Sequence, residues 1–413
     1  MKLKPITLMS RNFQLLLASK VISGLGSQIA AVAVPFAVIA IHGSVADVGY
    51  VSASSLVTTM LCLLFGGVVA DRVPRHHIII ASDGFQFLVQ AVTAALILNH
   101  HAQVWELIVQ AAFRGAALGF YMPAAQGLLS QTVSSDQLSQ ANAISSLGSN
   151  TAQIGGAALG GIIVGLVGPG WGLAADSVSF AAAGLLRIWM RFPALPPESR
   201  KPILHELHEG WRELMARRWL YAVIVQFSGV SAIAIGTLTV LGPIVADRHF
   251  DGAKSWGIIM ASYAAGSILS GTVMIKFRFR RMLMAGLLTG QAFALLLFAL
   301  AVPLVVPLTA AAAFIGGAGA QVFEINWATA MQHEIPLAML SRLSSFDMLG
   351  SMAFAPIGAV AAGLLASAYG PAAVLTVGGV LILLFTLIVL TVPDVRHLQQ
   401  RRPEHASEGD SGP

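Results

Sequence analysis

Twelve apolar stretches, each long enough to cross a lipid bilayer as a helix, divide this chain of 413 residues. A transmembrane helix needs roughly 20 mostly apolar residues. Only 10% of the residues are charged, whereas an average soluble domain carries about 25%. The pattern predicts an all-α membrane protein with twelve spans, at residues 13–41, 47–70, 77–98, 103–125, 141–166, 172–190, 219–245, 255–275, 282–302, 306–332, 347–368 and 372–392.

The Lys and Arg residues of the connecting loops predict the orientation. The loops on one side of the spans, and both tails, are rich in these residues, whereas the loops on the other side contain only Arg248 and Lys254. Because cytoplasmic loops carry an excess of Lys and Arg, both termini are expected in the cytoplasm. The net charge of +5 is spread over these short loops, which favours membrane orientation over nucleic-acid binding.

An internal repeat predicts two six-helix bundles. Phe113-Arg114-Gly115 aligns with Phe314-Ile315-Gly316, and Gly168-Pro169 with Gly370-Pro371. Repeated halves around a central site are typical of secondary transporters. The expected units are an N-terminal bundle (1–192), a cytoplasmic linker with an amphipathic helix (193–218), a C-terminal bundle (219–395) and a disordered cytoplasmic tail (396–413).

The loop between the second and third spans carries a motif. Its pattern, Gly67-x-x-x-Asp71-Arg72-x-x-Arg75, resembles the loop between helices 2 and 3 of major facilitator superfamily transporters. In that family the aspartate ties the two halves together on the cytoplasmic side when the binding site faces outward. The resemblance implies that Asp71, Arg72 and Arg75 act in gating. The alternative is an ordinary charged loop that follows the positive-inside rule.

Further motifs make the chain similar to the macrolide-efflux and enterobactin-exporter branch of that superfamily. They are Arg11-Asn12-Phe13, Asp176–Phe180, Glu209–Arg212 and the stretch Trp327–Asp347. The resemblance implies a monomer of the bacterial inner membrane that exports amphipathic small molecules, such as antibiotics, by alternating access coupled to proton entry. A siderophore or metabolite exporter and a non-transporting membrane scaffold or sensor are the alternatives. The sequence contains no nucleotide-binding loop, nucleophile elbow or metal cluster, so neither an enzyme nor a cofactor is expected.

Glycines of the fifth span are expected to pack against a neighbouring helix. Antiporters of the superfamily often carry Gly-Pro-x-x-Gly-Gly here, and this chain has Ala157 in place of the proline. Gly156, Gly160 and Gly161 still recur at helical spacing, which predicts a close helix contact.

Two charged residues, Arg114 and Glu324, lie deepest in the predicted spans. Charges at such depth are costly and usually face a cavity or a partner. The resemblance implies that spans 1, 4, 7 and 10 line a central cavity, across which these two side chains could face each other; a difference of a turn or two in depth would keep them from touching. Glu324 is the only carboxylate placed well away from a span end, which predicts it as the proton carrier and Arg114 as its permanently charged partner. A structural role at a helix junction is the alternative.

Polar and aromatic residues on the same four spans are candidate substrate ligands, although simple helix packing accounts equally well for each one alone. The candidates are Gln28, Tyr121, Gln226, Phe227, Asn326 and Trp327.

Overall fold

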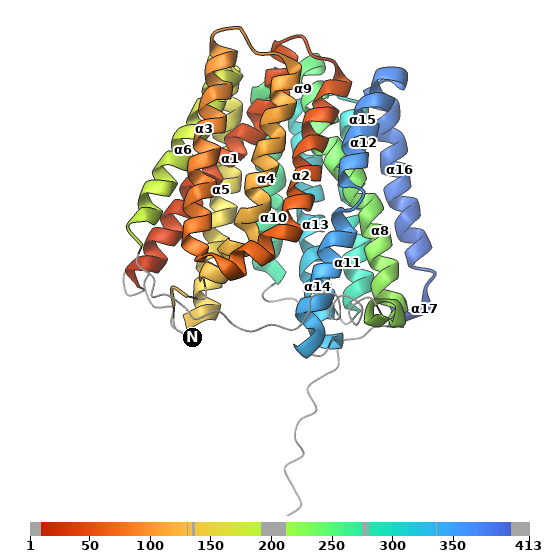
Figure 1. Cartoon of the computed structure of the whole chain (residues 1–413). Coiled ribbons are helices and arrows are strands. Elements are labelled where there is room, and N and C mark those ends of the chain that lie inside the picture. Colours follow the sequence, from red (N-terminus) through yellow and green to blue (C-terminus); the bar gives the residue numbers. More distant parts are fainter. Residues whose placement is uncertain are drawn as a thin grey trace, which may run out of the picture.

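The computed structural model describes residues 10–129, 131–133, 137–190, 212–274, 279, 281–335 and 337–397. Every regular element in these ranges is a helix, and the predicted all-α membrane fold is confirmed (Figure 1). Six helices form the first half and coincide with the first six predicted spans to within a few residues. They are α1 (Arg11–Ala40), α2 (Val45–Arg72), α3 (Arg75–Leu98), α4 (Val104–Leu129), α5 (Leu138–Val167) and α6 (Pro169–Ile188).

Helices of the second half follow the remaining six predicted spans, three of which are interrupted. The seventh span contains a π-helical turn, η3, between two α-helices, and such turns are frequent at functional sites. The ninth and eleventh spans each consist of two consecutive helices. The elements are α8 (Arg218–Ile235), η3 (Gly236–Leu241), α9 (Gly242–His249), α10 (Gly252–Met274), α11 (Met282–Gly290), α12 (Phe293–Ala301), α13 (Val306–Glu334), α14 (Leu337–Met352), α15 (Ala355–Tyr369), α16 (Pro371–Val389) and α17 (Pro393–His397).

Ten spans within the described residues are long and apolar enough to cross a membrane, by length and composition. The two predicted spans outside this group are α4 and α6. Each of them carries an acid and a base, Glu106 with Arg114 and Asp176 with Arg187. Both nevertheless run beside the other helices of the first half (Figure 1). The count of twelve spans therefore stays a prediction.

The internal repeat has a structural counterpart at the start of α6 and of α16. Gly168 and Gly370 have φ angles of 94° and 84°, and Pro169 and Pro371 begin the two helices. A positive φ favours glycine, and proline suits the first turn of a helix because its missing N–H needs no partner there. The same Gly-Pro pair thus begins the last predicted span of each half.

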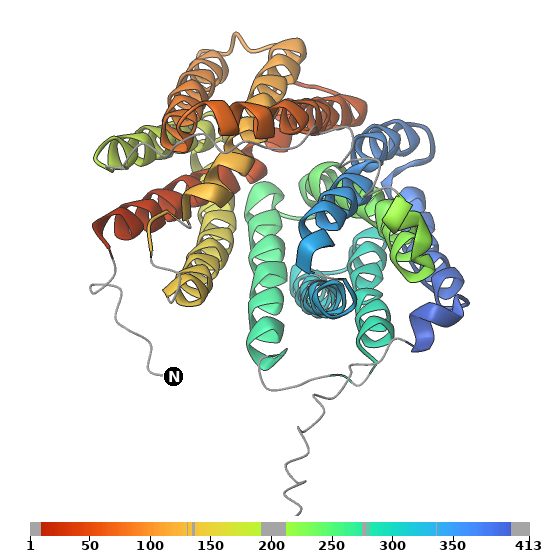
Figure 2. The same cartoon turned by 60° about the horizontal axis from the view of Figure 1, so that its bottom comes forward.

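The helices form two groups that follow the two halves of the sequence, as Figure 2 shows in red to yellow-green and in green to blue. Glycines allow close contacts inside each group. A Cβ atom at Gly115 of α4 would lie 2.1 Å from the Ser55 carbonyl of α2, and one at Gly317 of α13 would lie 2.0 Å from the Tyr263 carbonyl of α10. Such distances are too short for any larger residue, so both pairs of helices depend on these glycines.

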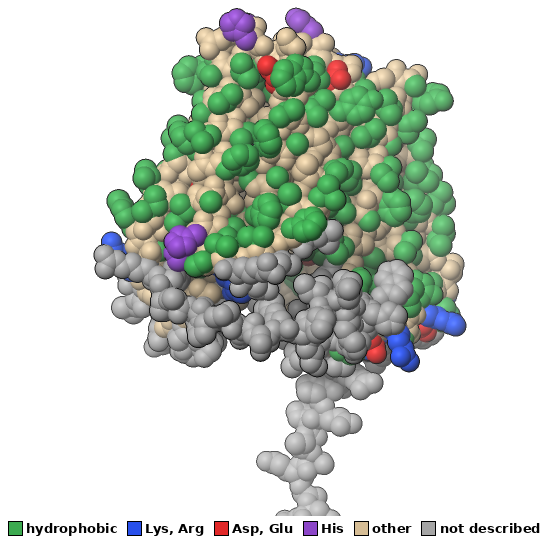
Figure 3. Space-filling model, viewed as in Figure 1, with side chains coloured by type: hydrophobic (Ala, Val, Ile, Leu, Met, Phe, Trp, Pro, Cys, Tyr) green, Lys and Arg blue, Asp and Glu red, His purple; other side chains and the backbone are tan. Residues whose placement is uncertain are grey.

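Large apolar side chains cover the outside of the helices, including Phe65, Val92, Leu166, Val225 and Leu387. In Figure 3 apolar side chains spread along the bundle, whereas the coloured charged and histidine side chains gather at its two ends. A surface that exposes this much apolar area between polar ends fits a lipid bilayer.

Two of the predicted units lie largely outside the described residues. Of the linker at 193–218, only residues 212–218 are described, and residues 212–216 among them are helical. The predicted tail begins at residue 396, but α17 continues to His397; residues 398–413 lie outside the described part of the chain.

Candidate functional site

Two adjoining cavities lie among the helices of the second half. One has a volume of about 240 Å³ and is lined by residues of α8, α10, α11, α12, α13 and α16. The other, of about 190 Å³, is lined by residues of α8, α13 and α14. Phe227, Phe323 and Glu324 line both cavities, so we treat the two as one binding region, the C-half cavity.

Stacked aromatic rings form the centre of the C-half cavity. The rings of Phe227 and Phe323 are 5.0 Å apart and nearly parallel, at 18°. The rings of Phe323 and Trp327 are 6.3 Å apart at 10°. Phe323 and Trp327 lie four residues apart on α13 and therefore point to the same side of that helix. The cavity thus offers flat apolar faces to a ligand.

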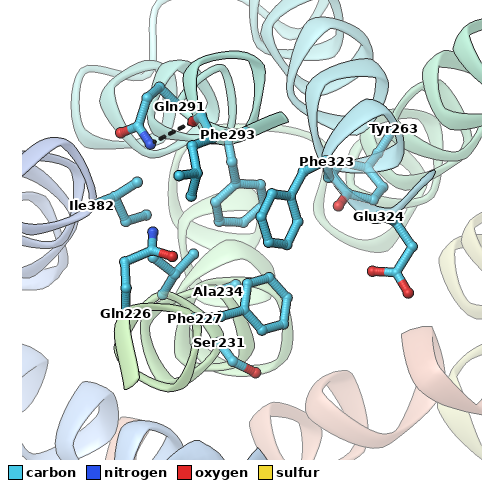
Figure 4. A pocket seen from close by; sticks show the side chains of 14 residues that line it. Gln226, Phe227, Ser231, Ala234, Tyr263, Gln291, Phe293, Phe323, Glu324 and Ile382 are labelled. Atoms are coloured by element: carbon cyan, nitrogen blue, oxygen red, sulfur yellow. Dashed lines mark hydrogen bonds between the residues drawn. The ribbon is translucent and has the colours of Figure 1, made fainter. Parts of the chain in front are cut away.

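Glu324 is solvent-exposed although it lies in the middle of α13. In Figure 4 its carboxylate points away from the rings of Phe323 and Phe227. Among the described residues, no Lys, Arg or His forms an ion pair with it. A carboxylate at this depth without a basic partner is available to a proton or to a positively charged ligand.

A second carboxylate, Asp347 of α14, lines the same cavity. The Trp327 indole donates a hydrogen bond from Nε1 to Asp347 Oδ2 at 2.8 Å, and the Ser351 hydroxyl donates to Oδ1 at 3.2 Å. These two neutral donors fix the orientation of the carboxylate without neutralising its charge.

Two amides close the other side of the cavity. The Gln226 and Gln291 side chains both donate from Nε2 to the Thr386 hydroxyl. The Oε1 atoms of both glutamines are buried without a hydrogen-bond partner among the described residues. Gln226 is only 8% exposed, and a buried acceptor without a donor is costly. Both side chains therefore keep an unused hydrogen-bond acceptor beside the cavity.

Arg114 forms no ion pair with Glu324 among the described contacts, and the coupling role of the two residues stays a prediction. Its Nη1 instead lies 3.5 Å from Asp176 Oδ2 of α6, and its Nη2 donates to the Ser27 carbonyl at 3.3 Å. Asp176 is fully buried and also accepts a hydrogen bond from Gln90. The pairing partner lies in the same half because α4 and α6 both pack in the first bundle.

A second buried ion pair in the first half joins Arg187 of α6 to Asp83 of α3. Both side chains are 1% exposed. Arg187 also donates from Nε to the Ser19 hydroxyl at 3.0 Å and from Nη2 to the Tyr121 hydroxyl at 3.2 Å. Glu324 is therefore not the only carboxylate within the helices. Asp83 and Asp176 are more buried than it is, although the sequence placed both near span ends.

The remaining predicted ligands fall into two groups. Gln226, Phe227 and Trp327 line the C-half cavity, as Glu324 does. The other three do not. Tyr121 accepts the hydrogen bond from Arg187, Asn326 is buried and donates to the Val322 carbonyl of its own helix, and Gln28 lies on α1 beside Gly156. A substrate role for these three residues stays a prediction.

The glycines of α5 contact two different helices. A Cβ atom at Gly156 would lie 2.6 Å from the Leu25 carbonyl of α1, and one at Gly160 would lie 3.0 Å from Ile29 Cα of the same helix. A Cβ atom at Gly161 would instead lie 2.9 Å from Gly257 Cα of α10, in the other half. Adjacent residues of one helix thus serve contacts within a half and between halves.

The two halves also meet where α2 contacts α15. Gly49 of α2 lies against the Ala359 carbonyl, and Gly363 of α15 lies against the Val45 carbonyl. Val45 begins α2 and Gly363 lies near the end of α15. This contact and the α5–α10 contact lie at the same end of the molecule, which we call the far end. The opposite end, where α1 begins and α2 ends, is the basic end.

Of the predicted gating residues, Asp71 and Arg72 form the last turn of α2, but their side chains lie outside the described residues. Arg75 begins α3 directly after Pro74. All three lie at the basic end, and their gating role stays a prediction.

Comparison with known proteins decides the family. The transmembrane secretion effector model of the major facilitator superfamily matches residues 4–408, nearly the whole chain. The chain belongs to this family of transporters. Its relatives include the multidrug efflux pump Tap of Mycolicibacterium fortuitum, 23% identical over 93% of this chain and 96% of the pump. Another is the enterobactin exporter EntS of Escherichia coli strain K12, 28% identical over 83% of this chain and 82% of the exporter.

Solved transporters share the fold of this family member. A bacterial homologue of the iron transporter ferroportin, in an inward-facing state, superimposes with a TM-score of 0.73 at 16% identity, covering 94% of this chain and 99% of its own. The D-xylose–proton symporter superimposes with a TM-score of 0.71 at 11% identity, covering 94% and 99%. At such identities the likeness concerns the fold alone. The predicted multi-pass membrane transporter, as opposed to an enzyme, is confirmed.

Sequence reasoning missed three residues of the C-half cavity, Asp347, Gln291 and Phe323. Asp347 belongs to the Trp327–Asp347 stretch that carries the family resemblance, but its place near a span end argued against a binding role. The spacing of Phe323 and Trp327 was the signal that could have identified Phe323 as a cavity residue. Residues at i and i+4 share one helix face, and Trp327 was already a candidate ligand.

Proposed function

We propose that this protein exports amphipathic small molecules across the bacterial inner membrane in exchange for protons, by alternating access. Its relatives include a multidrug efflux pump and an enterobactin exporter, which supports the outward direction. The C-half cavity combines aromatic faces with a few polar groups, as binding sites for small amphipathic molecules do.

The structure corresponds in this proposal to the state open toward the cytoplasm. The α5–α10 and α2–α15 contacts join the halves at the far end. The Lys and Arg residues of the loops place the basic end in the cytoplasm. Substrate would enter the C-half cavity from that side and leave after the halves separate at the far end.

Glu324 carries the proposed coupling, because it lines the C-half cavity and forms no ion pair with a base among the described residues. A proton from outside and a substrate from inside would then compete for one carboxylate. Because the proton and the substrate bind the same carboxylate in turn, this competition alone exchanges substrate for protons. Arg114 no longer serves as the direct partner, since Asp176 holds it in this state.

The test uses reconstituted vesicles loaded with a cationic, a neutral or an anionic amphipathic dye (ethidium, N-phenylnaphthylamine or fluorescein). An imposed pH gradient should drive efflux of at least one dye through the wild-type protein. Glu324→Gln keeps the shape of the side chain but removes its titration, so gradient-driven efflux should be lost while downhill exchange continues.

Asp251→Asn is the matched control, because Asp251 is a carboxylate of the same half whose side chain is 77% exposed at the far end. It should transport as the wild type does. Full gradient-driven efflux by Glu324→Gln would overturn the assignment and direct attention to Asp83 or Asp176. Failure of the gradient to move any of the three dyes in wild-type vesicles would contradict proton-coupled export of amphiphiles.

A siderophore exporter is the second candidate, favoured by the 28% identity to the enterobactin exporter. Loss of siderophore secretion from a deletion strain, restored by the wild-type gene, would favour this function. Unchanged secretion together with dye efflux would favour export of amphiphiles.

A further inference from the structure

The C-half cavity presents three kinds of chemical group in a fixed order. The carboxylates of Glu324 and Asp347 lie on one side, the rings of Phe227 and Phe323 in the middle, and the Gln226 and Gln291 amides on the other side. Figure 4 shows the Gln226 and Gln291 side chains near Ile382 and the Glu324 carboxylate beyond the ring of Phe323. This order indicates the chemistry of a molecule that would fill the cavity.

Among the described residues, no base forms an ion pair with either carboxylate of the acidic side. Asp347 accepts hydrogen bonds from the Trp327 indole and the Ser351 hydroxyl, and both donors are neutral. Two carboxylates on one cavity repel each other and attract a cation. The adjacent ring of Trp327 adds to this preference, because aromatic faces attract positive charge.

Two bases on helices of the first half already have partners of their own. Arg114 pairs with Asp176, and the Lys20 amine of α1 donates to the Ser145 hydroxyl of α5 at 2.8 Å. Both lie in the first half. The described contacts thus leave the charges of Glu324 and Asp347 for a ligand to neutralise.

The amide side independently calls for a hydrogen-bond donor. The Thr386 hydroxyl accepts hydrogen bonds from both glutamine amides, and the two buried carbonyl oxygens have no donor among the described residues. A molecule with hydrogen-bond acceptors alone would leave these oxygens unsatisfied, and buried acceptors of this kind discriminate strongly against such ligands.

We propose that the substrates of this transporter are organic cations with a flat aromatic body and a separate N–H donor. The cationic group lies against Glu324 and Asp347, the body stacks on Phe227 and Phe323, and the donor binds Gln226 and Gln291. The inference rests on the proposed function and narrows it from amphipathic molecules in general to one charge class. It also assigns substrate binding to Asp347, Gln291 and Phe323.

Equilibrium binding to the purified full-length protein in detergent tests the inference without transport. The probes are ethidium, a flat aromatic cation with N–H groups, tetraphenylphosphonium, a cation without them, and fluorescein, a flat anion. Ethidium should bind most tightly and fluorescein should not bind. Asp347→Asn should weaken ethidium binding by about tenfold, because it removes one of the two negative charges while retaining a hydrogen-bond acceptor.

Gln226→Leu separates the donor side from the acidic side. It should weaken ethidium binding several-fold and leave tetraphenylphosphonium binding unchanged, since that cation has no donor to lose. Asp251→Asn, with its exposed carboxylate, should leave all three affinities unchanged. Melting temperatures close to that of the wild type would show that each variant is folded.

Tight fluorescein binding with no ethidium binding would overturn the inference, as would an ethidium affinity within twofold of wild type in folded Asp347→Asn. Ethidium binding without gradient-driven export would contradict the proposed function alone. Gradient-driven efflux restricted to the neutral or anionic dye would contradict the cation preference alone.

Discussion

Arg114 of α4 and Asp176 of α6 form an ion pair inside the first half, with Nη1 and Oδ2 3.5 Å apart. Gly26 of α1 makes room for it, since a Cβ atom there would lie 2.8 Å from Asp176 Oδ1. Asp176 is fully buried, whereas the Arg114 side chain is 20% exposed. The pair therefore holds α1, α4 and α6 together and leaves part of the guanidinium in contact with solvent.

The two ion pairs of the first half should differ in their effect on stability. Asp83→Asn leaves the Arg187 charge unpaired and only 1% exposed, which should lower the free energy of unfolding by about 3–5 kcal/mol. Asp176→Asn should lower it less, because Arg114 retains access to water. Thermal unfolding of the two purified variants in one detergent shows which is less stable. Equal melting temperatures would contradict the prediction.

A double replacement distinguishes a stabilising pair from a merely tolerated one. Asp83→Leu combined with Arg187→Leu removes both charges and should recover most of the stability lost in Asp83→Asn, because no buried charge is left unpaired. If the double variant were less stable than Asp83→Asn, the hydrogen bonds of Arg187 to Ser19 and Tyr121 would account for more of the stability than the ion pair.

Gly160 and Gly161 are neighbours on α5 and should give opposite phenotypes as leucine variants. Gly160 lies against Ile29 of α1 in the same half, so Gly160→Leu should lower the melting temperature and the yield of inserted protein. Gly161 lies against Gly257 of the other half. Gly161→Leu should leave the melting temperature near that of wild type but prevent closure at the far end.

Cysteine labelling reports this closure. Ser231 lines the C-half cavity, and Cys62 is the only cysteine of the chain, so Ser231→Cys in a Cys62→Ser background gives a single reporter. A membrane-impermeant maleimide added to intact cells should label it faster in Gly161→Leu than in the parent. Unchanged labelling in a folded variant would show that the α5–α10 contact does not close the far end.

Much of the fold could be predicted because membrane spans depend on length and composition alone. The helices match the predicted spans closely, and the glycines of α5 do lie at helix contacts. The interruption of the seventh span by η3 was not predictable from composition, since Gly236 through Leu241 are as apolar as their neighbours.

The partner of Arg114 could not be predicted because it depends on how three helices rotate about their axes. Spacing contained a partial signal. Asp83 and Gln90 on α3 are seven residues apart, and Asp176 and Arg187 on α6 are eleven apart. Both intervals return to the same helix face at about 3.6 residues per turn. The sequence therefore allowed the prediction that polar residues of α3 and α6 face each other at two levels along the helices. Burial at both levels depends on packing, which spacing does not specify.

Asp71 should act on the opposite gate from Gly161. The family resemblance gives it the role of holding the basic end closed when the site faces outward, and Asp71→Asn would weaken that state. Because the far-end contacts of Gly161 and Gly257 are intact in this variant, the protein should remain in the state open at the basic end. Export should fall while insertion and melting temperature stay near wild type.

The Ser231→Cys reporter should then be labelled from outside more slowly in Asp71→Asn than in the parent, the reverse of the Gly161→Leu result. Combining Asp71→Asn with Gly161→Leu should bring labelling back toward the parent rate, since the two changes bias one equilibrium in opposite directions. Arg75→Gln removes the basic residue that begins α3, and it should slow labelling as Asp71→Asn does if the two side chains form one gate. Normal export together with parental labelling in a correctly inserted Asp71→Asn protein would remove Asp71 from the gate.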